Sequence, residues 1–196
     1  MIYIKDNFLD KEVFDFVEKG LKNNEFTEIK SPGISMWIQG VHKNFLNYVM
    51  SSLEVIEGGK IENIGAFFRE AKVKQDSNWR IHCDVKPIPG KGQPTRAAVL
   101  FFTGDKNKGL NGTGFWSHKK HGENLDVENM LDEYDRILIE DANDLSNWEL
   151  KSVIGNKKNR LISYPCDYFH SKYPKEAKKQ RIVFVMFYKN KGSYVE

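Results

Sequence analysis

The pattern of apolar and polar residues along the chain changes near residue 60. Before that point, two segments place apolar residues at the three- and four-residue spacing of an amphipathic helix, and they predict helices over about 10–23 and 44–55. Asp6 or Asn7 is expected to cap the first helix, and the two glycines after Glu57 to end the second. We expect both helices to pack against the outside of a sheet.

Short strands separated by turns dominate the rest of the chain. Residues 1–5 alternate like a short edge strand, and later strands are predicted over 61–74, 78–85, 96–103, 112–118, 151–155 and in two apolar runs within 160–188. Turns are expected at 31–33 and 104–111, and a Pro/Gly-rich loop at 86–94. Segment 128–150 has little periodicity, although its DLSNWEL stretch is compatible with a short helix. This α+β, mainly β pattern predicts a β-sandwich or jelly-roll core.

The length of 196 residues suits a single domain with a sizeable core. We predict one domain over 1–196, with helical N-terminal support in 1–59 and a jelly-roll core in 60–190. No apolar run approaches the ~18 residues of a membrane span. The opening MIYIKDNFLD has neither the basic nor the apolar region of a secretory signal, so the expected location is the cytoplasm, away from membranes.

Charge and cysteine content narrow the possible partners only slightly. The net charge is +3, and pairs of lysines near turns (119–120, 157–158 and 178–179) are typical of solvated loops rather than of a nucleic-acid-binding face. Nucleic acid is therefore not indicated, and an anionic substrate is permitted but not implied. Cys83 and Cys166 are too few for a disulfide framework, and we interpret them as reduced core thiols.

The candidate chemistry lies in two places. In the first, His82 and Asp84 are two residues apart, which puts both side chains on one face of a strand, with Cys83 on the other. In the second, two apolar strands flank a polar turn; His170 closes the first strand and Arg181 opens the second. Two imidazoles and one carboxylate suit Fe(II) with open positions for O2 and a co-substrate. A guanidinium entering a buried strand requires an anion, and a carboxylate matches its planar fork.

These residues, in this order, resemble the Fe(II)/2-oxoglutarate-dependent dioxygenase superfamily, especially its prolyl-hydroxylase-like branch. The matching stretches are His82 with Asp84, then NRLISYP (159–165), His170, and Gln180-Arg181 leading into IVFVMFY. The opening IKDNFLDKEVFDFV also resembles the strand and helix before the core of that branch. The resemblance implies a double-stranded β-helix (jelly roll) in which His82, Asp84 and His170 hold iron. It implies that Arg181 binds the distal carboxylate of 2-oxoglutarate, and that the reaction couples hydroxylation to decarboxylation of 2-oxoglutarate to succinate and CO2.

Two departures leave the second contact to 2-oxoglutarate unassigned. Val183 stands where some branches have a serine, and Val99-Leu100-Phe101-Phe102 lacks the tyrosine that the prolyl-hydroxylase branch often has on that strand. The candidates for this contact are Thr103, Tyr164 and Arg69. Arg69 is also a candidate substrate contact.

The segment 112–122 combines glycines, aromatic residues and two histidines. Phe115, Trp116 and His118 could line the substrate mouth, although a core strand followed by a solvated loop explains the same residues. His118 and His121 lack a further cysteine or carboxylate at metal-site spacing, so a second metal centre is not expected. The loop 86–94, with Lys86, is a candidate lid, and His42 is expected to be a surface or hydrogen-bonded histidine.

Two other functions use the same residues. A cupin-like sandwich would bind a metal or small ligand without oxygenase turnover, and a zinc hydrolase would use the same three ligands, with Arg181 as the argument against it. The substrate of the leading hypothesis is a small molecule or a peptide, including a prolyl residue. The oligomeric state is not determined by the sequence.

Overall fold

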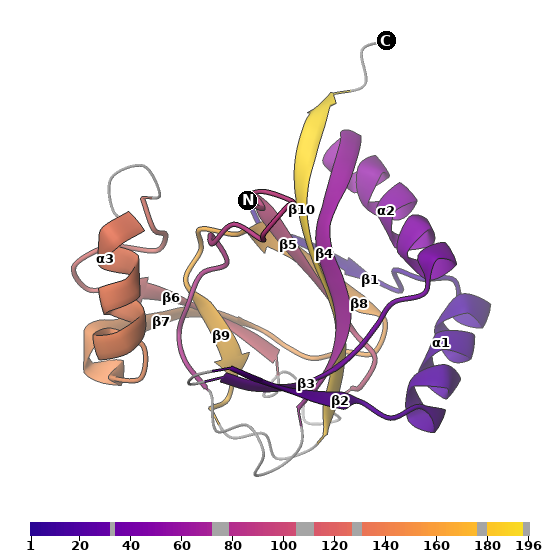
Figure 1. Ribbon diagram of the computed structural model, residues 1–196, viewed down its shortest axis with the longest axis horizontal. Helices are drawn as coiled ribbons and strands as arrows, with labels where there is room; N and C mark the ends of the chain where they lie inside the picture. The colour runs from indigo at the N-terminus through magenta and orange to yellow at the C-terminus, as the bar shows by residue number, and fades with distance from the viewer. Residues whose placement is uncertain (32–33, 72–78, 105–111, 127–130, 176–179, 194–196) are drawn as a thin grey trace.

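The computed structural model describes residues 1–31, 34–71, 79–104, 112–126, 131–175 and 180–193. Within these residues, ten strands form a seven-stranded antiparallel sheet, ordered β1-β8-β5-β10-β4-β3-β2, and a three-stranded one, ordered β7-β6-β9 (Figure 1). The strand bounds are β1 Tyr3–Asp6, β2 Thr27–Ser31, β3 Ile34–Gln39, β4 Gly59–Ala71, β5 Arg96–Phe101, β6 Gly112–His118, β7 Trp148–Ile154, β8 Arg160–Pro165, β9 His170–Tyr173 and β10 Arg181–Ser193. The fold is α+β, mainly β, with a jelly-roll core, as predicted.

The two N-terminal helices, α1 (Lys11–Asn23) and α2 (Lys43–Glu57), cover the outer face of the large sheet (Figure 1). Their aromatic side chains pack on those of the sheet: Phe14 stacks on Phe102 at 5.1 Å between ring centroids, and Phe45 meets Phe184 edge-on at 5.3 Å. Burial of these rings supplies much of the driving force that holds the helices in place. The predicted packing of the helices on the outside of the sheet is confirmed.

The predicted helix ends are close to the observed ones, with one correction. The residue before α1 is Asp10, not Asp6 or Asn7, because β1 continues to Asp6 and Asn7 has a positive φ of 50°. Gly58 ends α2 with φ of 70°, a left-handed conformation that glycine adopts without a steric penalty.

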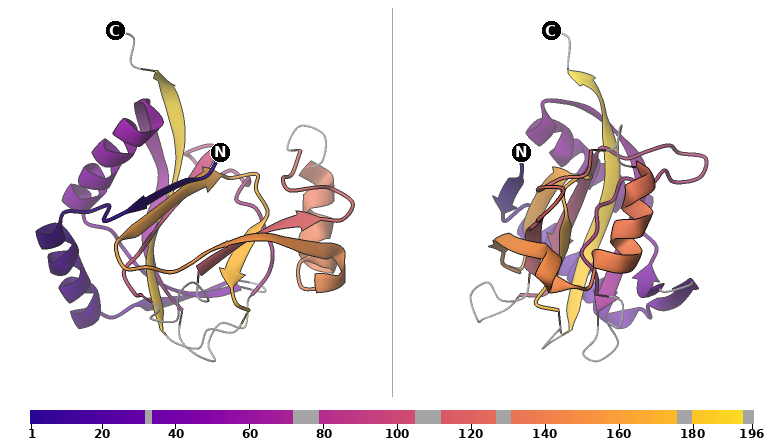
Figure 2. Two further views of the ribbon diagram at one scale, coloured as in Figure 1. Left: turned by 180° about the vertical axis from the view of Figure 1, so that it is seen from behind. Right: turned by 90° about the vertical axis from the view of Figure 1, so that its left-hand side faces the viewer.

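The strands at the centre of the large sheet alternate between two environments. On β10, Ile182, Phe184 and Met186 belong to the core beneath the helices, whereas the odd-numbered residues face the small sheet. Strands β4 and β5 follow the same rule, because successive side chains of a strand point to opposite faces. Seen from behind and from the side, the small sheet lies across the face of the large sheet that the helices leave uncovered (Figure 2). The odd-numbered positions are therefore the ones that can form a site between the sheets.

The first 59 residues contribute more than helices. Strands β2 and β3 pair with each other, and β3 pairs with β4 through Trp37↔Glu70 and its neighbours, so they extend the large sheet. Neither strand is predicted from the sequence, because TEIKS and ISMWIQ are short and mix charged, polar and apolar residues. The predicted turns at 31–33 and 104–111 lie largely outside the described residues.

The segment with little periodicity contains helix. Helix α3 (Leu131–Arg136) runs directly into a π-helical turn (Ile137–Asp141), which lies beside the small sheet and far from α1 and α2 (Figures 1 and 2). Of the DLSNWEL stretch, only Leu145–Asn147 forms a 3₁₀ turn, and Trp148 already begins β7. Within the described residues, no helix has the length and apolar character required to cross a membrane.

Candidate metal centre and its cavity

Two extended segments bring the three predicted ligands together. His82 and His170 form a single antiparallel bridge, in which each backbone N–H donates to the carbonyl of the other residue at 3.0 and 2.8 Å. His82 and Asp84 are predicted on a regular strand, but they lie on an extended segment held by this isolated bridge. His170 is predicted at the end of the preceding strand, but β8 ends at Pro165, which has no N–H to continue a ladder. The chain turns there, and His170 begins β9 in the small sheet.

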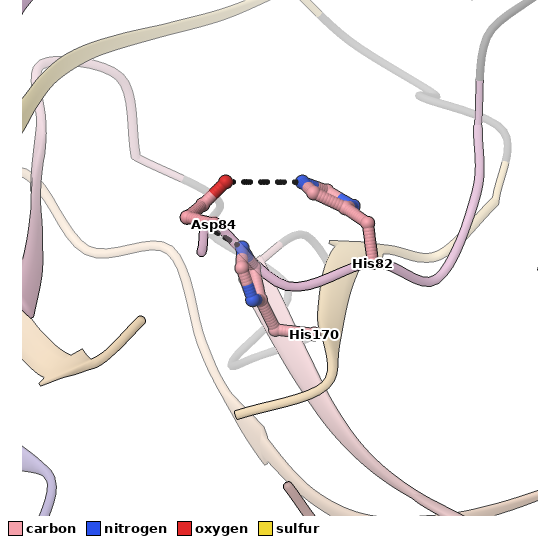
Figure 3. A group of neighbouring side chains, drawn as sticks. All are labelled: His82, Asp84 and His170. Atoms are coloured by element: carbon pink, nitrogen blue, oxygen red, sulfur yellow. Dashed lines mark ion pairs between the residues drawn. The ribbon is translucent and has the colours of Figure 1, made fainter. Parts of the chain in front are cut away.

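The donor atoms of His82, Asp84 and His170 converge on one point (Figure 3). The Asp84 carboxylate oxygens lie 3.8 Å from His82 Nε2 and 3.2 Å from His170 Nε2, and one ligand atom from each residue lies within 4.8 Å of the others. In the part of the chain that the structure describes, this is the only group of three or more such side chains with that convergence. The arrangement leaves room for a metal ion between them.

Hydrogen bonds to the backbone orient both imidazoles. His82 Nδ1 lies 3.1 Å from the Arg80 carbonyl, and His170 Nδ1 lies 2.9 Å from the Tyr168 carbonyl. Because a carbonyl oxygen only accepts, Nδ1 must carry the proton in each ring. The Nε2 lone pairs then point toward Asp84, which is the outer-shell arrangement that metal-binding histidines require.

Burial and mutual charge keep this site in its ligating protonation state. Burial, reinforced by the neighbouring His170, lowers the pKa of His82 from 6.5 to about 4. Burial alone would raise the pKa of Asp84, but the neighbouring His170, with His82 and Arg69, outweighs that effect, so the pKa is lowered. At neutral pH the site therefore presents an anionic carboxylate and a neutral His82.

A cavity of about 320 Å³ between the two sheets contains this group. Arg181 lines it from the first residue of β10 and is 8% exposed. Its Nη2 lies 3.5 Å from Thr113 Oγ1, and its guanidinium carbon lies 5.2 Å from the centroid of the Phe101 ring. The predicted position of Arg181, opening a strand and entering a buried cavity beside the candidate ligands, is the one the structure has.

The candidates for a second co-substrate contact divide into two groups. Tyr164 and Arg69 both line the cavity, and the Tyr164 ring lies 4.7 Å from that of His170. Thr103 does not: β5 ends at Phe101, and the bend that follows places the Thr103 hydroxyl on the side of α1, where it accepts from the Ile182 backbone N–H at 3.2 Å. That expectation is corrected.

Thr113 lines the cavity although it is not among the predicted site residues. It lies on β6, is 3% exposed and meets Arg181. Its spacing of two from Phe115, which the sequence analysis had placed at the site, could have identified it, since i and i+2 share a face of a strand.

The predicted substrate-mouth residues on β6 lie elsewhere. Phe115 is buried against Tyr164 and His170, at 5.2 and 6.4 Å between ring centroids, as part of the wall behind the site. Trp116 donates through its indole N–H to Ser171 Oγ at 2.9 Å and belongs to the core on the other side of the small sheet. His118 points the same way, so Trp116 and His118 are corrected to structural positions outside the cavity, as the core-strand explanation held.

His118 nevertheless belongs to a second cluster of titratable residues. Its ring stacks with that of His121 at 4.7 Å, its Nε2 lies 3.3 Å from Asp141, and His121 Nε2 lies 3.4 Å from Glu133. Burial lowers the pKa of both histidines. The Lys120 backbone N–H donates to His118 Nδ1 at 3.2 Å, so the neutral His118 ring carries its proton on Nε2. An N–H in that position cannot ligate a metal.

Two smaller expectations have clear outcomes. Cys83 and Cys166 are buried free thiols, and burial raises the pKa of both, as expected of inert core cysteines. His42 is hydrogen-bonded, because its Nδ1 accepts the Asn44 N–H at the start of α2.

Comparisons with known proteins agree with this architecture. No protein-family model matches the chain, and no curated protein matches its sequence. Among solved structures, HygX from Streptomyces hygroscopicus with nickel and 2-oxoglutarate bound aligns over 97% of this chain and 83% of that chain, with 8% identity and a TM-score of 0.61. The viral collagen prolyl hydroxylase vCPH from Paramecium Bursaria Chlorella virus-1 aligns over 97% and 90%, with 13% identity and a TM-score of 0.55. A prolyl-4-hydroxylase from Pseudomonas putida aligns over 97% and 93%, with 10% identity and a TM-score of 0.55.

At such low identity these similarities establish the fold alone. The predicted fold is confirmed, because HygX with 2-oxoglutarate bound and two prolyl hydroxylases share it.

Proposed function

We propose that this protein is an Fe(II)/2-oxoglutarate-dependent dioxygenase that hydroxylates a small-molecule or peptide substrate and converts 2-oxoglutarate to succinate and CO2. One observation carries the proposal: His82, Asp84 and His170 converge on a point in the same cavity that Arg181 enters. The zinc hydrolase and the metal-binding sandwich both leave a buried arginine beside the ligands without a role.

The donor set fits iron. Two imidazoles with Nε2 lone pairs and one carboxylate, all from one side, make a facial triad with open positions. The fold is shared with HygX with iron bound and with the 2-oxoglutarate complex of vCPH. Bound Fe(II), with 2-oxoglutarate and O2, would supply oxidising chemistry that amino-acid side chains lack.

The chain's own residues would bind, orient and shield the reactants. Arg181 would pair with the distal carboxylate of 2-oxoglutarate through two N–H groups, and Thr113, next to it, would donate its hydroxyl to the same carboxylate. Burial raises the pKa of Tyr164 well above its usual range, so this hydroxyl stays protonated and is available as a donor. The apolar walls, including Val99 and Val183, would exclude water from these charge-assisted contacts.

Thermal melting of metal-stripped protein under anaerobic conditions tests this function. Fe(II) or Mn(II) and 2-oxoglutarate are added separately and then together, to wild type and to Arg181→Met. We expect a metal-dependent stabilisation by 2-oxoglutarate of about 2.7 kcal/mol at 100 times its dissociation constant, lost in Arg181→Met. A metal shift without a 2-oxoglutarate shift would instead favour the metal-binding sandwich, and hydrolytic turnover with zinc but none with iron would favour the hydrolase.

A pair of threonines provides a matched control for the co-substrate site. Thr113→Val is expected to weaken 2-oxoglutarate binding by about 2- to 10-fold, the worth of one hydrogen bond. Thr103→Val removes a hydroxyl that serves the Ile182 N–H on the opposite side of the sheet, so it should lower stability and leave the affinity for 2-oxoglutarate unchanged. Equal effects of the two variants on 2-oxoglutarate affinity would argue against the assignment of Thr113.

A further inference from the structure

A second cavity also reaches the candidate metal centre. It has a volume of about 440 Å³, lies between the π-helical turn and the loop that follows Asp84, and includes His82 and Asp84 in its wall. Arg181, Thr113 and Tyr164, which are proposed above to hold 2-oxoglutarate, line only the first cavity. The proposed function therefore leaves the second cavity to the other organic reactant, the substrate.

The wall of the second cavity is apolar away from the metal centre. Its apolar side chains come from the loop, the π-helical turn and β10, and they are Ile88, Pro94, Leu138, Ile139 and Phe187. All but Pro94 keep part of their surface exposed, and Ile139 is 81% exposed. Apolar side chains that remain exposed around one cavity are typical of a ligand-binding surface.

The polar side chains of that wall are largely engaged with other groups. Lys86 forms an ion pair with Asp135, and the Tyr134 hydroxyl donates to the Cys83 carbonyl. The remaining polar side chains of the described wall also line the first cavity, and they are Arg80, His82 and Asp84. A ligand in the second cavity would therefore meet apolar surface on most sides and polar groups at the metal end.

One side of this wall is tied to the ligand segment before and after His82. The Ile81 backbone N–H donates to the Ala142 carbonyl, just after the π-helical turn, at 3.0 Å. The hydroxyl of Tyr134, on α3, donates to the carbonyl of Cys83. Helix and π-helical turn thus take the place of a neighbouring strand for the ligand segment. These bonds hold the apolar side chains of the turn at a fixed position relative to the metal ligands.

The other side of the wall is held against the large sheet. Ile88 lies over Gly65 of β4, where a Cβ atom would be 3.1 Å from Ile88 Cδ1 and 3.9 Å from the Phe187 ring. The glycine therefore lets Ile88 pack down onto the strand beside Phe187. The Ile88 and Gly92 backbone N–H groups each donate to the carbonyl of the other residue, at 2.9 and 3.1 Å, which closes the turn of the loop. Both sides of the cavity are thus formed before a ligand binds, as is usual for small-molecule sites.

We propose that the substrate of the hydroxylase carries an uncharged apolar group, aliphatic or aromatic, which binds in the second cavity with a C–H bond at the metal end. The reaction inserts one oxygen atom of O2 into that C–H bond and transfers the other to succinate, while 2-oxoglutarate releases CO2. A polyhydroxylated group in the same place would lose its hydration against apolar walls, so it binds poorly. This inference rests on the proposed function, because it concerns the substrate of that reaction.

Paramagnetic relaxation by Mn(II) tests where an apolar group binds. Protein in excess over Mn(II), without oxygen and with saturating 2-oxoglutarate, is mixed with N-acetyl-L-leucinamide or N-acetyl-L-asparaginamide. These neutral probes have nearly the same shape, and an amide in the second replaces the two methyl groups of the first. The Cβ ¹H signals of the leucine probe should relax faster near the bound Mn(II), and those of the asparagine probe should be unaffected. A stronger effect on N-acetyl-L-phenylalaninamide would assign the group as aromatic.

A matched pair of variants separates the second cavity from the rest of the surface. Ile139→Asn should weaken the affinity of the leucine probe by about tenfold, within the range over which apolar pockets discriminate small changes. Val55→Asn makes a similar change on α2, where Val55 is 80% exposed, and it should bind the probe like wild type. Both positions are exposed, so both variants are expected to fold. Leu138→Ala is a second variant of the same wall, and calorimetry should show unchanged affinity for 2-oxoglutarate in all three.

Other outcomes would overturn the inference. Equal relaxation of the leucine and asparagine probes would mean that their shared backbone amides bind, and it would reject the apolar class. Relaxation that persists unchanged in both Ile139→Asn and Leu138→Ala would place the probe outside the second cavity. No relaxation of the leucine or phenylalanine probe, with normal 2-oxoglutarate binding, would reject this inference and leave the proposed function intact, whereas failure to bind 2-oxoglutarate would reject both.

Discussion

Two regions of this molecule bring a pair of histidines together with carboxylates. In one, His82 and His170 lie with ring centroids 4.5 Å apart beside Asp84; in the other, His118 and His121 lie 4.7 Å apart beside Asp141 and Glu133. The residue types and the separations of the rings are similar. By composition alone the second cluster, with two carboxylates, would be the better candidate for a metal site.

The difference lies in the backbone groups that meet Nδ1. Carbonyls face Nδ1 of His82 and His170, so each ring carries its proton there and offers the Nε2 lone pair to a common point. An N–H faces Nδ1 of His118, so the proton of the neutral ring sits on Nε2, 3.3 Å from an Asp141 carboxylate oxygen. The capacity of a histidine to ligate a metal therefore depends on the local backbone, which fixes the tautomer, as much as on its neighbours.

The largest expected effect is on metal binding. His170→Ala removes one of three ligands, and we expect the affinity for Mn(II) to fall by about 100-fold or more. Mutation of a residue that only hydrogen-bonds to a metal ligand already lowers metal affinity by about 10- to 100-fold. His118→Ala should leave the affinity within twofold of wild type. Titration of free Mn(II) by electron paramagnetic resonance at a temperature where both variants are folded measures this difference.

The number of Mn(II) ions bound per chain can contradict this comparison. Wild type should bind one Mn(II) per chain. A second Mn(II) that disappears in His118→Ala would show that the second cluster binds metal after all, and that the hydrogen bond from the Lys120 N–H does not determine its tautomer.

The sequence predicted more of the site than of the scaffold around it. His82, Asp84, His170 and Arg181 could be found because their order and spacing are specific, and Arg181 stood out as a charge entering the apolar run IVFVMFY. The tautomers were not predictable, since they depend on backbone groups that only the folded chain brings into place. Thr103 and Thr113 show the same limit: both are threonines near strand ends, and the bend after β5 turns Thr103 away from the cavity while Thr113 on β6 meets Arg181.

The errors in the predicted strands have a related cause. Strands β2 and β3 are stabilised by pairing with each other and with β4, which their mixed sequences do not reveal. The path from β8 to β9 combines Pro165 with a change of sheet, so His170 lies in a different sheet from the strand that precedes it. Long-range pairing decides such features, whereas helix periodicity is local and was predicted within two or three residues.

A smaller effect is expected on stability. His118 is 5% exposed and its ring meets that of Trp148 edge-on at 4.6 Å. His118→Ala should therefore lower the free energy of unfolding by about 1–3 kcal/mol, through lost packing and an unsatisfied Lys120 N–H. Urea unfolding of the metal-free protein measures it. A change below the error of that experiment would mean that the second cluster is not a structural element.

The smallest effect, and the one that tests the tautomer of His118, is on the pH dependence of stability. Burial lowers the pKa of His118 below its ordinary 6.5, against the attraction of Asp141. In the unfolded chain His118 therefore takes up a proton near pH 6.5, whereas in the folded chain it does so only at lower pH. The free energy of unfolding then falls as the pH drops from 7 to 5. For this one group the decrease is at most about 1.4 kcal/mol per pH unit. His118→Gln should remove that part of the slope.

The pKa of His82 is also lowered, so His82 makes the free energy of unfolding fall with pH in the same direction. Because His82 is present in both wild type and His118→Gln, its contribution cancels when the two proteins are compared. A His118→Gln variant whose stability falls with pH in parallel with wild type would show that His118 takes up its proton in the folded state as readily as in the unfolded one. Its Nδ1 would then not be held as an acceptor, and the tautomer that distinguishes the two histidine pairs would no longer be fixed by the fold.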